Sequence, residues 1–155
     1  ESLQVIKTVA QDGDIVLIEG VEKLRQIRKE QISMDTISQE IRIYGWDDMK
    51  AHGNQGELRK RLSTILEKQR KHEEKYKKES NTLHKEWNEN FNTYNEYNNK
   101  RNQSLIAAMH EVTQANPDKR IFILAGNNHF AKADNVQAAL RKYPFIALQH
   151  MQKKV

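Results

Sequence analysis

The chain has 155 residues, 37% of them hydrophobic and 30% charged, and a formal net charge of +5 at pH 7. This length is enough for one domain with a real core. Because the sequence has no cysteine, it excludes disulfides, thiolate zinc sites and cysteine nucleophiles. No apolar run approaches the ~20 residues that a membrane span needs.

The sequence opens at Glu1 rather than at a methionine and shows no signal-peptide pattern. A processed, secreted or trimmed protein would begin in this way. Because the sequence has neither a membrane span nor a signal-peptide pattern, we expect a soluble protein and leave its compartment open. The positive charge is local, because residues 59–78 hold nine Lys or Arg against three Glu, whereas residues 79–98 hold one Lys against four Glu. This pattern indicates a solvated helix face rather than a specific nucleic-acid site.

The first elements are read from the spacing of their apolar residues. Residues 3–9 have helical spacing, and residues 15–18 form an apolar run typical of a short buried strand. Glu19 closes this strand, and a carboxylate at that place must be hydrogen-bonded, paired or exposed in a cleft. Residues 21–40 then have helical spacing, with Asp35 as the expected cap of a second short helix.

Residues 41–44 are a second apolar run of strand type, and they end in a turn at Gly45, Trp46 and Asp47. Tyr44 and Trp46 add aromatic side chains beside the acid. We expect these two residues to contact a ligand at the end of the strand.

The middle of the chain, residues 57–116, has no glycine or proline, and its apolar or aromatic residues recur at a spacing close to 3.5. One helix of that length would span about 90 Å, so the segment either folds back as a hairpin or projects and packs against another chain. The weakest helix formers, residues 78–82 and 88–99, are where we expect a bend. We therefore predict an α/β core of residues 1–55 and 117–155, with a long charged helical insertion of residues 56–116.

Residues 121–125 form a continuous apolar run, typical of a strand that is buried on both faces of a parallel sheet. Gly126 turns the chain and exposes Asn127, Asn128 and His129 just outside the sheet edge, where we expect the two asparagines to contact a ligand. We then predict a helix over residues 133–142 and a final strand over residues 145–148. Residues 149–155 are expected to be a frayed basic tail.

Three predicted strands thus end with glycine beside an ionisable or amide group. If the strands are parallel and adjacent, Glu19, Asp47 and His129 converge at one edge of a small, mainly parallel sheet. His129 at this edge is a candidate general base, metal ligand or structural hydrogen-bonding group. Arg101, which opens an amphipathic run, is a candidate to hold a carboxylate through its bidentate guanidinium, the alternative being a surface cation.

The order of these motifs resembles a known group of proteins. Residues 100–109 with 120–129 resemble the closing half of the erythromycin-esterase-like, ChaN-like and TraB/Tiki-like superfamily, in which an arginine-bearing helix leads into a strand and a histidine turn. Residues 15–20 resemble its strand-glutamate element, and residues 41–47 its strand-glycine-acid element. The family's first strand, with its own histidine turn, would precede Glu1.

The resemblance implies an α/β fold with a helical insertion and a polar cleft at the strand ends. Members include esterases that activate water with a histidine, metal-dependent peptidases and a haem-binding lipoprotein. The positions that match the family's functional residues are Glu19, Asp47, Arg101 and His129.

Three functions remain open. The first is hydrolysis of a small-molecule or peptide ester or amide, by water that His129 or a divalent metal on Glu19 and His129 activates. The second is binding of haem or another apolar ligand in the same cleft. The third is a non-catalytic role, in which the long helices form a homo-oligomer or bind another partner.

Overall fold

The computed structural model describes residues 2–72, 77–131, 134–142 and 145–150. The fold is of the α/β class, as predicted, with a small, mainly parallel sheet and long helices. The chain divides into two compact units, one made of residues up to 49 together with those from 102 onward, and one made of residues 50–101.

The sheet lies in the first unit and contains five strands in the order β2-β3-β1-β4-β5. The strands are β1 (Ile15–Glu22), β2 (Gln26–Ile27), β3 (Arg42–Asp47), β4 (Ile121–Gly126) and β5 (Phe145–His150). All neighbouring pairs are parallel except β2 and β3, which are antiparallel. The three strands predicted to end in polar groups are therefore parallel neighbours, and β1 lies between the other two.

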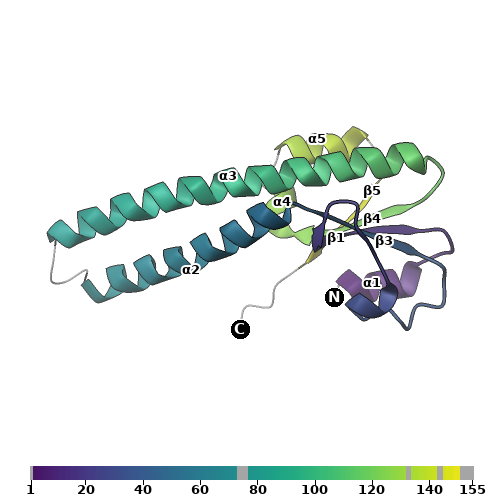
Figure 1. Ribbon diagram of the computed structural model, residues 1–155, viewed down its shortest axis with the longest axis horizontal. Helices are drawn as coiled ribbons and strands as arrows, with labels where there is room; N and C mark the ends of the chain where they lie inside the picture. The colour runs from purple at the N-terminus through teal and green to yellow at the C-terminus, as the bar shows by residue number, and fades with distance from the viewer. Residues whose placement is uncertain (1, 73–76, 132–133, 143–144, 151–155) are drawn as a thin grey trace. The chain divides into compact units, whose positions relative to one another are not determined.

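The central strands are apolar along their length because helices or loops cover both faces of the sheet. On one face of the sheet, the strand side chains form a core cluster with α1 (Ser2–Val9) and with the segment around the 3₁₀ turn η1 (Lys29–Ile32). On the other face, strand residues pack with the end of α3 (Lys77–Ala115) and with α5 (Asp134–Lys142). Figure 1 shows α1 and α5 on opposite sides of the sheet.

The helix predicted over residues 21–40 is wrong. Residues 21 and 22 continue β1, residues 26–27 form β2, and residues 29–32 form only η1. The backbone of this stretch bonds to β3 and in short turns rather than in a continuous helix, since the N–H of Leu24 donates to the carbonyl oxygen of Gly45, and the N–H of Gly45 donates to that of Arg25. No helix follows Asp35 within this described stretch.

The short turn expected after Gly126 is a one-turn helix, α4 (Asn127–Ala131). The last strand continues to His150, so residues 149 and 150 do not belong to a frayed tail, and residues 151–155 lie outside the described residues. The end of α3 packs on the sheet through Leu105, Met109 and Val112, as expected for its amphipathic run.

The second unit is a helical hairpin. It consists of α2 (Met49–His72) from residue 50 onward and of α3 up to residue 101. Three hydrogen-bonded pairs show that the helices are antiparallel: Gln55 with Asn98, Arg59 with Tyr94, and Arg61 with Glu86.

The bend of the hairpin is not where the sequence predicted it. Residues 78–82 and 88–99 belong to α3, α2 ends at His72, and residues 73–76 lie outside the described residues. Weak helix propensity did not break α3, because its hydrogen bonds and packing against α2 outweigh a few tenths of a kcal/mol per residue. None of the described helices has the length and apolar character of a membrane span.

Candidate functional site

Glu19 reaches the end of β4 through an irregularity in β1. The pairing of β1 with β3 shifts between Ile18 and Glu22, and Gly20 within this bulge has a φ of +78°. Only glycine adopts that conformation without strain, and such bulges re-aim neighbouring side chains. The Oε2 atom of Glu19 accepts a hydrogen bond of 2.7 Å from the backbone N–H of Gly126.

His129 lies on α4, directly after β4, and its ring is held on two sides. The Nε2 atom is 3.4 Å from Oε1 of Glu19, and the Nδ1 atom is 2.6 Å from Oδ1 of Asn102 on α3. The ring of Trp46 meets it edge to face, with 5.1 Å between ring centroids. His129 is only 3% exposed, so its orientation is fixed by packing as well as by hydrogen bonds.

Asp47 ends β3 and completes the group at the strand ends. Its Oδ2 atom accepts a hydrogen bond of 3.0 Å from the N–H of Gly20, and the residue is fully buried. One carboxylate oxygen of Asp47 lies within 4.8 Å of one of Glu19. The predicted convergence of the three strand ends is therefore confirmed, and we call Glu19, Asp47 and His129 the strand-end cluster.

The strand-end cluster can hold a proton, through the close pair of Glu19 and His129. It combines two carboxyl groups with an imidazole in a mostly buried place, where opposite charges attract more strongly than they do in water. Glu19 is the more accessible of the acids, since 28% of its side chain is exposed. Solvent therefore reaches the cluster on the side of Glu19.

The residues predicted to contact a ligand differ in exposure. Asn127 and Asn128 are exposed at the start of α4, and Tyr44 is partly buried against the core. Trp46 is fully buried, and its Nε1–H donates a hydrogen bond of 2.9 Å to the carbonyl oxygen of Leu124. This burial favours a supporting role for Trp46, while the asparagines remain able to meet a ligand.

Arg101 belongs to the second unit, where it is the last residue. Its guanidinium donates a hydrogen bond of 2.6 Å to the side-chain oxygen of Gln55, and only 4% of the residue is exposed. The surface-cation alternative is therefore wrong. The role expected of Arg101, holding a carboxylate, stays a prediction.

Asn102 is the site residue that sequence reasoning missed. It is 2% exposed, and its side chain contacts His129 from a different element. The available signal was its place directly after Arg101, at the start of the amphipathic run that packs on the sheet. A buried amide at that position needs a polar partner.

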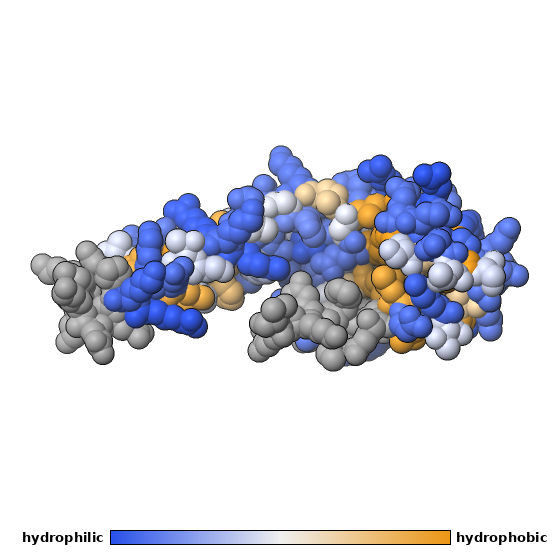
Figure 2. All heavy atoms as spheres, turned by 90° about the horizontal axis from the view of Figure 1, so that it is seen from below, coloured by the Kyte–Doolittle hydropathy of each residue, from blue (hydrophilic) through white to orange (hydrophobic). Residues whose placement is uncertain are grey.

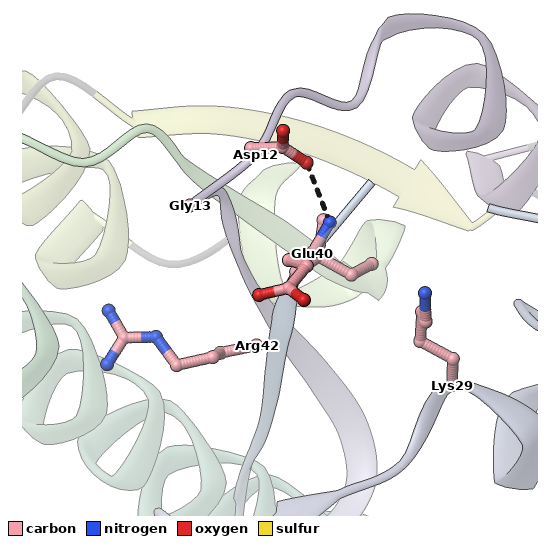
Figure 3. Close-up of a pocket in the computed structure, with 6 residues that line it drawn as sticks. Asp12, Gly13, Lys29, Glu40 and Arg42 are labelled. Carbon is pink, nitrogen blue, oxygen red and sulfur yellow. Dashed lines mark hydrogen bonds between the residues drawn. The ribbon is translucent and has the colours of Figure 1, made fainter. Parts of the chain in front are cut away.

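A second candidate lies at the opposite end of the sheet, where β1 and β3 begin. It is an open hollow of about 520 Å³ lined by Asp12, Gly13, Lys29, Glu40, Ile41 and Arg42 (Figure 3).

Three of the four charged side chains of this hollow are hydrogen-bonded to the protein. Asp12 accepts a hydrogen bond from the N–H of Glu40, the Lys29 ammonium donates to two backbone carbonyl oxygens, and the Arg42 guanidinium donates to Asn116. These bonds hold together the segments that lead into β1 and β3. The hollow is therefore the weaker candidate for a functional site.

Comparisons with protein-family models, with curated proteins and with solved structures each found no match to this chain.

Proposed function

We propose that this chain is a hydrolase-like protein that acts on an ester or amide substrate at the strand-end cluster. The observation that carries the proposal is the 3.4 Å approach of His129 Nε2 to Glu19 Oε1 at the carboxyl ends of adjacent parallel strands. Ligand and active sites of open α/β sheets lie at such edges. The resemblance to the erythromycin-esterase-like, ChaN-like and TraB/Tiki-like superfamily supports the same function.

In the proposed reaction, a water molecule between the cluster and the substrate loses a proton to the cluster as its oxygen bonds to the carbonyl carbon. When the ester C–O or amide C–N bond breaks, the cluster gives this proton to the departing alcohol or amine. His129 Nε2 is the proposed base, because a histidine has a basicity suited to proton transfer near neutral pH. Glu19 stabilises the imidazolium that forms. The carboxylate-holding role of Arg101 remains what the family resemblance implies, and the proposed step does not depend on it, because Arg101 belongs to the second unit.

Glu19 and His129 are also the proposed ligands of a divalent metal. Two ligands of a tetrahedral zinc ion, each at about 2.1 Å from the metal, lie about 3.4 Å apart, and Glu19 and His129 have that separation. The contact of Nδ1 with Asn102 is also of the kind that orients a metal-binding histidine. Such a metal would lower the pKa of a bound water and so supply the nucleophile.

The test measures hydrolysis and metal content together. Wild type, Glu19→Gln and His129→Gln are assayed with a panel of activated esters and short peptides, with and without added zinc, manganese or cobalt. We expect hydrolysis by the wild type and a loss of 10²-fold or more in kcat/KM for either variant, a typical effect of losing an acid–base group. His84→Gln and Glu96→Gln, at exposed positions of α3, are the matched controls.

Hydrolysis that His129→Gln and His84→Gln retain equally would contradict the proposal, as would a wild type inactive on the whole panel with every metal. The panel is repeated with haem present. A Soret shift that is lost in His129→Gln, together with no hydrolysis, would assign the cluster to haem binding instead.

We further propose that the helical hairpin associates with a second copy of itself. Leu66 and Phe91 are 46% and 38% exposed, and each adjoins buried or stacked side chains of the hairpin. Leu66 follows Ile65, which is only 3% exposed, and Phe91 stacks on Trp87 and Tyr94. Figure 2 shows apolar atoms reaching the surface between hydrophilic side chains. Two helices alone leave such an apolar stripe uncovered.

Charge favours a second copy as the partner. Residues 59–71 of α2 carry six Lys or Arg and one Glu, whereas residues 81–98 of α3 carry one Lys and three Glu. An arrangement of two hairpins that places α2 of each copy beside α3 of the other pairs these opposite charges and forms a four-helix bundle.

Light scattering over a range of protein concentrations tests this association. We expect a dimer for the wild type and for Thr64→Glu, and a monomer for the double variant Leu66→Glu and Phe91→Glu. A wild type that is monomeric at all concentrations would rule the association out.

A further inference from the structure

Two hydrogen-bond acceptors flank the ring of His129, and they compete for one proton. Asn102 Oδ1 lies 2.6 Å from Nδ1, and Glu19 Oε1 lies 3.4 Å from Nε2. An amide oxygen can only accept, and so can an ionised carboxylate oxygen. A neutral imidazole has a single N–H, so only one of the two contacts is a hydrogen bond.

The distances decide which contact is the hydrogen bond. The contact to Asn102 is short for a hydrogen bond, whereas 3.4 Å lies beyond the usual range of 2.7–3.2 Å. The bond to Asn102 is also well protected from water, because Asn102 and His129 are 2% and 3% exposed. Glu19 does not depend on the ring, since its Oε2 atom already accepts the N–H of Gly126.

We propose that Asn102 is a positioning residue that holds neutral His129 with its proton on Nδ1 and thereby keeps a lone pair on Nε2, on the side of Glu19. This inference rests on the proposed function only for its catalytic consequence. A general base and a metal ligand both need the unprotonated Nε2, which the bond at Nδ1 provides. Without Asn102, the carboxylate of Glu19 is the acceptor that remains, and it draws the proton to Nε2.

The experiment reads the position of the proton directly. The ¹⁵N chemical shifts of the imidazole nitrogens are measured in histidine-labelled protein, in chelator-treated buffer and at a pH where the ring is neutral. His129→Gln identifies the signals of His129 among the six histidines of the chain. We expect the wild type to show a protonated Nδ1 and an unprotonated Nε2.

Two variants of similar size separate hydrogen bonding from packing. Asn102→Leu keeps the volume of the side chain but removes the acceptor, and we expect the proton of His129 to move to Nε2. Asn102→Asp keeps an acceptor oxygen, and we expect the proton to stay on Nδ1. In the hydrolysis assay, Asn102→Leu should lose at least 10-fold in kcat with little change in KM, and Asn102→Asp should recover part of that loss.

A wild type with its proton on Nε2 overturns the inference without recourse to any variant, as does an unchanged Nδ1–H in a folded Asn102→Leu protein. The predicted proton positions together with no hydrolysis of any substrate would remove the proposed function and leave the role of Asn102 intact. Hydrolysis by a wild type that carries the proton on Nε2 would leave the proposed function intact and remove the role of Asn102.

Discussion

His129 and Glu19 face each other across the ends of β4 and β1, with 3.4 Å between the imidazole Nε2 and the carboxylate Oε1. Each residue is also bound on its other side, His129 to Asn102 and Glu19 to the backbone of Gly126. The pair is therefore part of the packing of the sheet end and of the proposed chemistry at once. Substitutions of different kinds should separate these two contributions.

Glu19 offers the clearest separation. Glu19→Gln keeps an oxygen that accepts from the N–H of Gly126 but removes the charge that faces His129. We expect its free energy of unfolding in urea to stay within ~1 kcal/mol of the wild type while the hydrolysis rate falls. Glu19→Ala leaves the N–H of Gly126 without this partner and should cost ~1–3 kcal/mol. Equal unfolding free energies for the two variants would mean that the bond to Gly126 contributes nothing.

Asp14 should make the stability depend on pH. Burial raises the pKa of its carboxyl, but hydrogen bonds from the Arg120 guanidinium and the N–H of Gln11 outweigh burial and hold the pKa below its ordinary value of 3.8. A lowered carboxyl pKa stabilises the fold above pH 3.8, and this contribution is lost as the pH falls through the lower, folded-state pKa. Urea unfolding should give a wild type ~1–3 kcal/mol more stable than Asp14→Asn at pH 5–7.

The difference between wild type and Asp14→Asn should begin to shrink below about pH 3.8 and should be smallest at the lowest pH at which the protein remains folded. Asp118→Asn, at an exposed position, is the control and should show no such loss. If the wild type instead became more stable relative to Asp14→Asn as the pH fell, the proposed effect of the Asp14–Arg120 ion pair would be contradicted.

Gly45 should not tolerate a side chain. A Cβ atom built there would lie 2.3 Å from the backbone carbonyl oxygens of Val21 and Glu22. Backbone atoms cannot move aside as a flexible side chain can, so Gly45→Ala should destabilise the protein by ~3 kcal/mol or more. Gly53→Ala in α2, where no atom lies within 4 Å of the new methyl group, should instead stabilise by ~0.5–1 kcal/mol. Thermal unfolding of the two variants measures both effects.

The two tryptophans should respond differently to replacement by phenylalanine. Trp46→Phe keeps an aromatic ring but removes the hydrogen bond to the carbonyl oxygen of Leu124. In the described part of the chain, Nε1 of Trp87 has no hydrogen-bond partner, so Trp87→Phe removes only packing. We expect urea unfolding to show Trp46→Phe as less stable than Trp87→Phe by ~1–2 kcal/mol. Equal decreases in the free energy of unfolding would indicate that the hydrogen bond of Trp46 makes no net contribution to stability.

The strand ends were predictable because their signal is local. Runs such as residues 121–125 are apolar without interruption, and a glycine marks the end of each run. Parallel strands that pair side by side bring such ends together whatever their separation along the chain. The approach of Glu19 to His129 follows from this rule and from the order of the strands.

The remaining features depend on partners that are distant in sequence. The apolar residues of 21–40 have helix-like spacing, yet Ile27 and Ile37 bury on the sheet from an irregular path that pairs with β3. The meeting of Asn102 with His129 likewise depends on how α3 packs over β4, which no pattern within α3 reveals. Tertiary pairing overrode local preference in both places.

The bond between Glu19 and Gly126 joins residues 107 positions apart. Contacts of such long range form late, because the intervening chain must lose its freedom before they can close. During synthesis on the ribosome, β1 and Glu19 emerge well before the strand that orients them. A nascent or truncated chain that stops short of β4 would therefore lack the proposed site, because neither Gly126 nor His129 would be present to hold Glu19 in place.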